Sequence, residues 1–200
     1  MTTQSKRRLT AGERRQDVLL AGCRVFASRS YRGATTAEIA RESGISEPIL
    51  YRHFGSKRDL YLACLDESWR RFKAEAESLI TEDPHGCLGR IAEAYMQSQE
   101  RVRLIDLWIQ ALSVAPEDEV IAKALREQIR EVHDFFADVV RRGQELGDVL
   151  PDRDPVAEAW IFVASGLLAT VDHRLGGLLG DDLQRVRTER KRWMTGISTE

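Results

Sequence analysis

Proline, cysteine and long apolar runs are all scarce in this 200-residue chain, and each scarcity excludes a class of protein. Five prolines and no Ser- or Gly-rich stretch leave no candidate for a long flexible linker. Three cysteines, far apart and without a CxxC pair, favour a reduced cytosolic protein over a disulfide-stabilised secreted one.

Membrane and secretion signals are also missing from the sequence. The N-terminal segment has no apolar stretch of the kind that secretory signals need. The longest apolar run, Val156 to Val171, contains Glu158 and is too short to span a bilayer comfortably. We therefore expect a cytoplasmic protein with no membrane partner.

Motifs of catalysis were sought without success. The sequence holds no GxSxG, HExxH or P-loop motif, and no GxGxxG that follows a strand. The close His/acid pairs, His133–Asp134 and Asp172–His173, are adjacent in sequence and so point to different faces of a helix. We predict no enzyme, metal site or cofactor, and a helical enzyme with an incidentally basic N-terminus is kept as an alternative.

Helix signals, in contrast, are present throughout. Thr10, Thr35 and Ser56 are each followed three residues later by an acidic residue, which is the spacing of a capping box. Apolar residues then recur at helical spacing, and no strand alternation is found. The pattern predicts an all-α chain with helices over about 11–30, 35–43, 47–54, 57–80, 87–100, 101–114, 117–145, 154–175 and 181–195.

Charge divides the chain into two parts. Residues 1–60 hold 12 Lys/Arg and 6 Asp/Glu, whereas residues 61–200 hold 18 and 26. A basic first third, with Lys6–Arg8 as a short N-terminal arm, suggests a polyanionic partner. An unevenly charged, solvated surface would give the same counts, so the motifs must decide.

The stretch ISEPILYRHFGSKRDLY, residues 45–61, follows a short helix and Gly44, and together they predict a helix-turn-helix. Ile45, Leu50 and Phe54 would anchor its second helix. Side chains that can bind phosphates are Thr35, Thr36, Tyr51, His53 and Lys57. Side chains exposed enough to reach bases are Glu47, Pro48, Ile49 and Arg52. Tyr51 can instead pack its ring, and His53 can instead cap the helix.

The longer stretch GATTAEIARESGISEPILYRHFGSKRDLY resembles the DNA-binding signature of the TetR family of bacterial transcription regulators. The matching features are TT-x-x-IA, the G-I-S turn and LYRHFGSK, within roughly residues 12–61. The resemblance implies phosphate contacts by Thr36, Tyr51, His53 and Lys57, and places Glu47, Pro48 and Ile49 at the base-reading end. Glu47 is a departure, because an acid can accept from cytosine N4 but also repels phosphate.

The resemblance also implies a domain organisation: residues 1–60 bind DNA, and residues 61–200 form a helical effector-binding and dimerisation domain. Aromatic residues spread over the second domain would line a pocket for a small, largely apolar effector. The candidate pocket residues are Trp69, Phe72, Tyr95, Met96, Trp108, Phe135, Phe136, Trp160 and His133. For any single aromatic, however, core packing is the default interpretation, because aromatic residues dominate protein cores. A redox signal through the cysteines, or a protein partner, is the alternative to a small molecule.

The segment VAEAWIFVASGLLATV, residues 156–171, is apolar nearly all round, which predicts a helix buried on two sides. One side would face its own domain and the other a second copy of the chain. The predicted interface residues are Val163, Ala164, Gly166, Leu167 and Val171. A central helix of a monomer would show the same pattern. The resemblance favours a homodimeric repressor that binds a double-stranded DNA operator.

Overall fold

The computed structural model describes residues 10–97 and 99–197, and leaves the side chains of residue 96 and residues 99–104 undescribed. Within these ranges every regular element is an α-helix, which confirms the predicted all-α class. The chain divides into two compact units, Met1–Glu67 and Ser68–Glu200, called unit 1 and unit 2 below. The predicted N-terminal arm Lys6–Arg8 lies outside the described residues.

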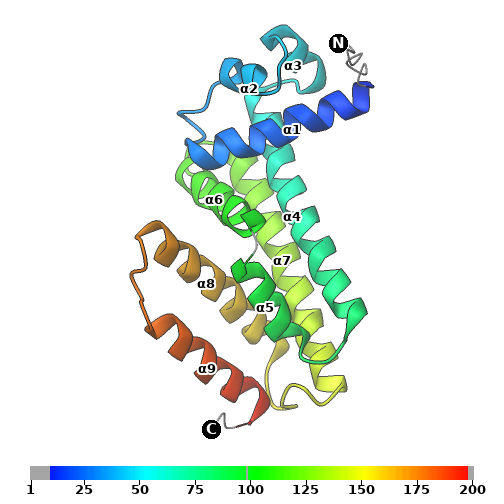
Figure 1. Ribbon diagram of the computed structural model, residues 1–200, viewed down its shortest axis with the longest axis vertical. Helices are drawn as coiled ribbons and strands as arrows, with labels where there is room; N and C mark the ends of the chain where they lie inside the picture. Colours follow the sequence, from blue (N-terminus) through cyan, green and yellow to red (C-terminus); the bar gives the residue numbers. More distant parts are fainter. Residues whose placement is uncertain (1–9, 98, 198–200) are drawn as a thin grey trace, which may run out of the picture. The chain divides into compact units, whose positions relative to one another are not determined.

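Unit 1 contains α1 (Ala11–Ser28), α2 (Thr36–Glu42), α3 (Glu47–His53) and the start of α4 (Lys57–Glu82) (Figure 1). The predicted capping box at Thr10 and Glu13 is complete, with both reciprocal hydrogen bonds present. Thr35 caps α2, because its hydroxyl accepts the Glu38 N–H at 3.1 Å. Gly44 between α2 and α3 has φ 66°, a left-handed conformation that only glycine adopts at little cost.

The two units divide inside α4, after the boundary that the sequence suggested at residues 60 and 61, because the first turns of α4 pack on α1. A Cβ added to Gly22 of α1 would lie 3.2 Å from Cys64 Sγ and 3.2 Å from Leu60 Cδ1. Such a close approach needs glycine. Further along α4, Glu67 Oε1 accepts a hydrogen bond from Gln16 Nε2 at 2.9 Å. These contacts make the start of α4 part of unit 1.

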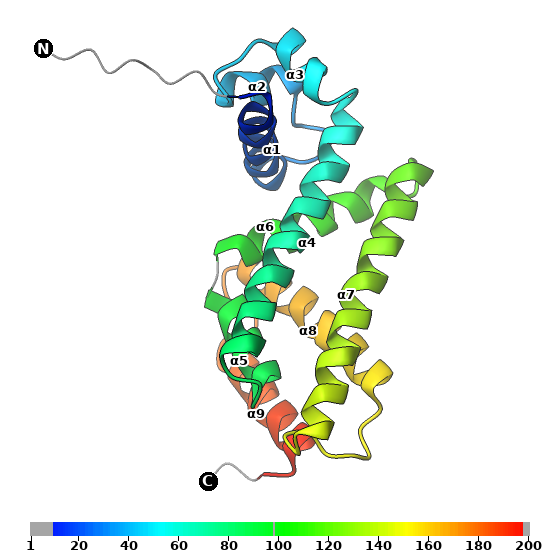
Figure 2. The same cartoon turned by 90° about the vertical axis from the view of Figure 1, so that its right-hand side faces the viewer.

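Unit 2 contains the rest of α4 with α5 (Cys87–Gln97), α6 (Gln99–Val114), α7 (Glu119–Glu145), α8 (Pro155–Arg174) and α9 (Asp182–Thr195). The long α7 packs against α5, α6 and α8 (Figures 1 and 2). Asp118 and Asp154 cap α7 and α8 with side-chain acceptors. These bounds agree with the helices that the sequence predicts to within a few residues.

The last helix, α9, is attached at its C-terminal end. Met194 packs with Val140 and Val149, and the N–H of Leu150 donates to the Met194 carbonyl at 2.9 Å. Gly196 ends the helix with φ 69°. The remainder of α9 runs beside α8 (Figure 1) and leaves several apolar side chains exposed.

Candidate DNA-binding surface and aromatic cluster

The second helix of the helix-turn-helix has two distinct faces. Leu50 is fully buried and Phe54 nearly so, which confirms their predicted role as anchors. On the other face, Ile49 is 37% and Tyr51 45% exposed, with Pro48 and Arg52 beside them in the open. α2 packs against both α1 and α3, and the Arg15 guanidinium of α1 lies 4.5 Å from the centre of the Phe54 ring at the end of α3.

Three of the predicted DNA-contacting side chains contact one another instead of standing free. The Thr36 hydroxyl donates to the Glu47 carboxylate and lies 3.1 Å from the Tyr51 hydroxyl. Thr36 is consequently only 8% exposed, and Glu47 is half-buried. In this structure Glu47 is therefore held by α2 rather than free to reach a base.

Lys57 is also held, at the start of α4. Its Nζ lies 4.8 Å from the centre of the Tyr31 ring and 3.5 Å from the Arg32 carbonyl oxygen. Burial lowers the pKa of Lys57. Tyr31 completes an aromatic group with Phe26 and Tyr61, at 6.1 and 4.8 Å between ring centres. Sequence reasoning missed Tyr31, although an aromatic residue in the loop before α2 was the available signal.

In unit 2, most of the predicted pocket residues form a single cluster of rings. Ring centres lie 5.8 Å apart for Trp69–Phe72, 5.7 Å for Trp69–Phe135, 5.1 Å for Phe72–Tyr95 and 5.3 Å for Phe135–Phe136. Phe162 of α8 stacks on Phe136 at 3.9 Å. The rings come from α4, α5, α7 and α8, and they fill the space between those helices.

The other predicted pocket residues have separate roles. Trp108 is buried and donates its Nε1–H to Gln128 Oε1 at 2.6 Å, a contact between α6 and α7. Trp160 is 43% exposed and stacks on His133 at 4.3 Å, while His133 Nε2 lies 3.1 Å from the Val156 carbonyl oxygen. The Met96 side chain lies outside the described residues.

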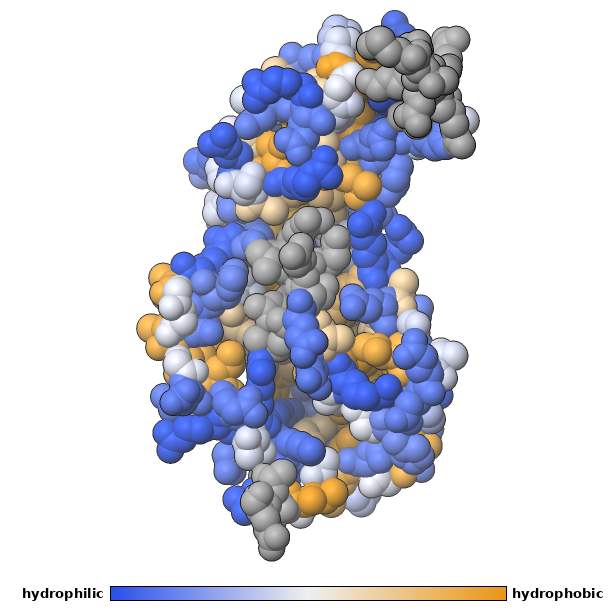
Figure 3. Space-filling model, in the orientation of Figure 1, coloured by the Kyte–Doolittle hydropathy of each residue, from blue (hydrophilic) through white to orange (hydrophobic). Residues whose placement is uncertain are grey.

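The outer faces of α8 and α9 are apolar and uncovered in the single chain. The exposed apolar side chains there are Val156, Trp160, Ile161, Leu168, Val171, Leu175, Leu178, Val186 and Trp193. Figure 3 shows apolar groups at the edge where α8 ends and α9 begins. By length and composition alone α8, at 20 residues, could cross a membrane, but the core helix of a water-soluble protein passes the same test. Ion pairs of Glu158 with α9 and of Arg174 with Asp106 tie α8 to its own domain.

The face of α8 that the sequence assigned to a partner is only partly outward. Val163 is 8% exposed, and a Cβ added to Gly166 would lie 3.5 Å from Ile105 and 3.8 Å from Tyr95 of the same chain. Leu167 is half-buried, whereas Ala164 and Val171 are exposed. Val163 and Gly166 therefore pack inside unit 2, and the outward stripe is centred on Ile161, Ala164 and Leu168.

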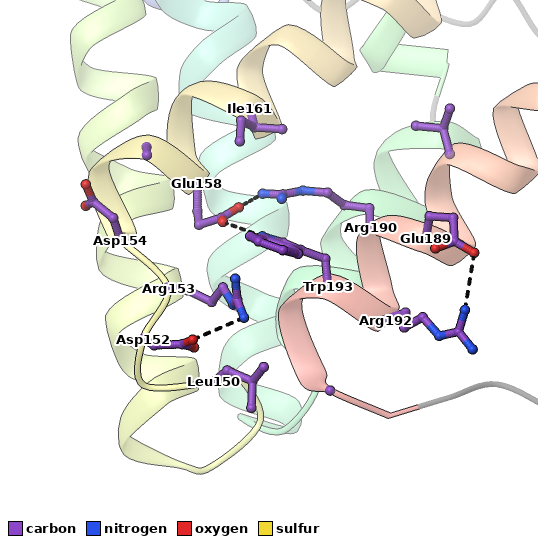
Figure 4. A pocket seen from close by; sticks show the side chains of 13 residues that line it. Leu150, Asp152, Arg153, Asp154, Glu158, Ile161, Glu189, Arg190, Arg192 and Trp193 are labelled. Carbon is purple, nitrogen blue, oxygen red and sulfur yellow. Dashed lines mark hydrogen bonds and ion pairs between the residues drawn. The ribbon is translucent and has the colours of Figure 1, made fainter.

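A cleft of about 930 Å³ separates the outer parts of α8 and α9 (Figure 4). Glu158 lies in it, buried, paired with Arg190, and accepting the Trp193 Nε1–H at 3.0 Å. The Arg153 guanidinium lies 3.7 Å from the Trp193 ring centre. Burial, helped by Arg153, lowers the pKa of Arg190. In the sequence, Glu158 is visible only as an interruption of an apolar run, and the spacing of residues does not indicate its partners on α9.

Comparison with known proteins matches both units to families. Residues 18–64 match the model of bacterial regulatory proteins of the tetR family, and residues 84–188 match that of the BetI-type transcriptional repressor C-terminal domain. The transcriptional activator FasR of Mycolicibacterium smegmatis is 50% identical over 58 residues, 29% of this chain and 26% of FasR. The regulator BetI of Brucella anthropi is 28% identical over 123 residues, 60% of this chain and 63% of BetI. The chain thus spans about a quarter of FasR and less than two thirds of BetI.

Solved structures share the fold along nearly the whole chain. A TetR-family transcriptional regulator from Cytophaga hutchinsonii has a TM-score of 0.79 at 16% identity, covering 97% of this chain and all of its own (100%). A regulator from Saccharomonospora viridis, solved in complex with choline, has a TM-score of 0.76 at 21% identity, covering 91% of this chain and 95% of its own. With one family model on the helix-turn-helix and a second on more than half of the residues, the chain belongs to the TetR family of bacterial transcriptional regulators.

Proposed function

We propose that the chain is a dimeric, cytoplasmic repressor that binds a double-stranded DNA operator and leaves it when a small, largely apolar effector binds unit 2. The two-faced α3 carries this proposal: Leu50 is buried while Pro48, Ile49, Tyr51 and Arg52 face outward. A helix anchored on one face and open on the other can enter the major groove. Around it, we expect Thr35, Thr36, His53 and Lys57 to bind phosphates once DNA displaces their present partners, contacts that fix register.

Dimerisation is supported by the uncovered faces of α8 and α9. Monomeric soluble proteins rarely expose contiguous apolar patches, and patches of this kind mark interfaces. Two such helices from each chain would form a four-helix bundle. The interface we propose uses the stripe Ile161, Ala164, Leu168 and Val171 of α8, together with Val186 of α9.

The effector site we propose is the ring cluster of Trp69, Phe72, Tyr95, Phe135 and Phe136. Because these rings contact one another, a ligand must part them to enter. Apolar ligands are favoured by such a lining. A quaternary ammonium ligand would also suit it through cation–π attraction, and choline, found in the Saccharomonospora viridis relative, is a natural first probe.

α4 is the element through which the effector would act. It carries Lys57 in unit 1 and Trp69 and Phe72 in unit 2. A ligand that binds among the rings can change DNA affinity only by binding one conformation of the protein more tightly. Coupling of about 1–3 kcal/mol is the usual scale. Half-sites about one helical turn apart would make operator binding sensitive to such a change.

The redox alternative is weakened by the environment of the thiols. Cys23, Cys64 and Cys87 are all buried. Burial raises the pKa of the Cys64 thiol, with Cys23 beside it adding to the effect, and burial also raises the pKa of Cys87. The reactive form is the thiolate, so these environments disfavour oxidation.

The test begins with selection of duplexes from a random pool by the purified full-length chain. Selected duplexes are then assayed by mobility shift with choline, with its neutral isostere 3,3-dimethylbutanol and with hexanol. Release by the neutral compounds supports an apolar effector, and release by choline alone supports a cation–π site. A reporter placed behind the selected sequence separates repression from activation. Failure to enrich any sequence would contradict operator binding.

A further inference from the structure

Glu47 accepts a hydrogen bond from Thr36, a hydroxyl that is expected to bind a DNA phosphate. We propose that Glu47 determines specificity by occupying two positions. In the free protein, its carboxylate accepts the hydrogen bond from Thr36 that a DNA phosphate would otherwise accept. On the operator, the carboxylate turns to accept a hydrogen bond from a cytosine amino group. This inference rests on the proposed operator binding.

The proposed position of Glu47 in the free protein rests on the geometry of two hydroxyls, those of Thr36 and Tyr51. Thr36 Oγ1 donates to Glu47 Oε1, and Tyr51 OH lies 3.1 Å from the same Thr36 oxygen. A hydroxyl has a single hydrogen to donate, so Thr36 cannot serve the carboxylate and a phosphate at once. DNA that uses Thr36 must therefore first break its bond with Glu47.

The proposed contact with cytosine on the operator rests on the place of Glu47 in α3. Glu47 is the first residue of α3, beside the exposed Pro48 and Ile49 at the end of the helix that would meet bases. Carboxylates accept from cytosine N4 in the major groove. Once displaced from Thr36, Glu47 gains a new donor only where a cytosine is within reach.

The consequence is a penalty on incorrect DNA. Every duplex must displace the carboxylate from Thr36 and then carries an acid close to its phosphates, but only a cytosine-containing site restores the lost hydrogen bond. Specificity gained by penalising incorrect partners is a general strategy of recognition. Glu47 should thus weaken non-specific binding more than it weakens operator binding.

Unit 1 offers a matched control for the charge itself. Glu42 ends α2, is exposed and pairs with Arg24 at 2.8 Å, away from the Thr36 hydroxyl. Glu42→Ala therefore removes the same charge from the same unit without freeing Thr36. Any effect of Glu47→Ala beyond that of Glu42→Ala belongs to the local contact.

The experiment measures binding to an alternating A·T duplex, which lacks cytosine, by fluorescence anisotropy at fixed salt, together with selection from a random pool. Glu47→Ala removes the acceptor on Thr36 and offers no amide to adenine, so it should bind the A·T duplex about fivefold tighter than the wild type, or more, whereas Glu42→Ala should change it less. The wild type should enrich cytosine at one position in each half-site. Glu47→Ala should lose that enrichment, and Glu47→Leu serves as the second variant if Glu47→Ala does not fold.

A double-mutant measurement at positions 36 and 47 distinguishes two explanations: displacement of the Glu47 carboxylate from Thr36, and simple repulsion between that carboxylate and the DNA phosphates. In a Thr36→Val background the carboxylate has no hydroxyl to hold, so the gain from Glu47→Ala should fall to the level of Glu42→Ala. A full gain in that background would overturn the proposal, as would equal effects of Glu47→Ala and Glu42→Ala with the wild-type hydroxyl present. If the wild type binds neither the A·T duplex nor any selected sequence, the proposed function itself fails.

Discussion

Units 1 and 2 differ in which side chains they leave uncovered. In unit 1, α3 buries Leu50, while its open face carries Ile49, the Tyr51 hydroxyl and Arg52, with Lys57 nearby at the start of α4. In unit 2 the open faces of α8 and α9 offer Ile161, Leu168 and other apolar side chains. A largely polar open face is stable in water and needs no partner until it binds a polyanion. An extended apolar face is unfavourable in water until a second apolar surface covers it.

The two units also differ in their aromatic residues, which gives a way to observe them separately. All four tryptophans, Trp69, Trp108, Trp160 and Trp193, lie in unit 2, and three of the four tyrosines lie in unit 1. Tryptophan fluorescence therefore follows unit 2 alone, while circular dichroism follows the helices of both.

The largest expected effect is on the apolar face. Ile161→Glu together with Leu168→Glu would place charges at a proposed symmetric interface, once in each copy. A charge at a buried interface position weakens association by about 2 kcal/mol or more. Because the symmetric dimer carries both changes twice, the dimer dissociation constant should rise by about a millionfold, and only monomer should be seen by sedimentation at micromolar concentration.

The control for this change is Leu112→Glu, because Leu112 is 50% exposed on α6, away from the proposed interface. It should leave the sedimentation behaviour unchanged. Gly166→Leu is a poor probe of the interface, since its new side chain would collide with Ile105 and Tyr95 of the same chain. If the wild type sediments as a monomer, the apolar faces of α8 and α9 do not need a partner surface, and the contrast with unit 1 fails.

The next largest effect compares the two faces of α3, through changes at the adjacent residues Ile49 and Leu50. Leu50→Ala removes a fully buried side chain and should lower the free energy of unfolding by about 2–5 kcal/mol. Ile49→Ala, at a position 37% exposed, should change stability by less than about 0.5 kcal/mol and alter base preference instead. In denaturant, the loss for Leu50→Ala should be visible by circular dichroism and small by tryptophan fluorescence. Equal shifts by both probes would show that the units unfold together.

Helix positions could be read from the sequence because their signals are local. Thr10, Thr35 and Ser56 cap their helices through residues three positions away, and Gly44 marks its turn by its own conformation. Contacts between distant segments could not be read in this way. The Thr36–Glu47 bond joins two helices, and nothing in the spacing of either residue distinguishes a paired glutamate from a free one.

The same limit explains the revised face of α8. When a helix is apolar nearly all round, periodicity shows that both sides are covered but not which side faces its own domain. The side is decided by Ile105 and Tyr95, which approach Gly166, and by Phe136, which stacks on Phe162. Similarly, composition marked Trp108 as a pocket candidate, whereas its partner Gln128 makes it a structural contact.

A smaller effect distinguishes the aromatic residues of unit 2 from one another. Trp108→Phe leaves the buried Gln128 oxygen without its donor and should lower the stability of unit 2 by about 1–3 kcal/mol. Operator affinity and effector response of the folded protein should remain normal. Trp69→Ala, within the ring cluster, should instead weaken effector response more than operator binding. If both variants lose stability and operator affinity together while their response to the effector stays normal, the ring cluster is part of the hydrophobic core and not an effector site.

The smallest expected effect is a pH dependence confined to unit 2. Asp148 accepts the Gly86 N–H at 2.8 Å and lies 3.2 Å from His85 Nδ1, and the backbone hydrogen bond above all holds the pKa of Asp148 below its usual value. A carboxyl whose pKa is lower in the folded state stabilises the fold above its unfolded pKa, about 3.9. That contribution is lost as pH falls through the folded pKa. Because the group is partly exposed, Asp148→Asn should cost only about a few tenths of a kcal/mol at pH 7 and nothing at the lowest pH. Tryptophan fluorescence should detect the difference. A constant cost for Asp148→Asn at every pH would mean that the aspartate acts through shape rather than charge.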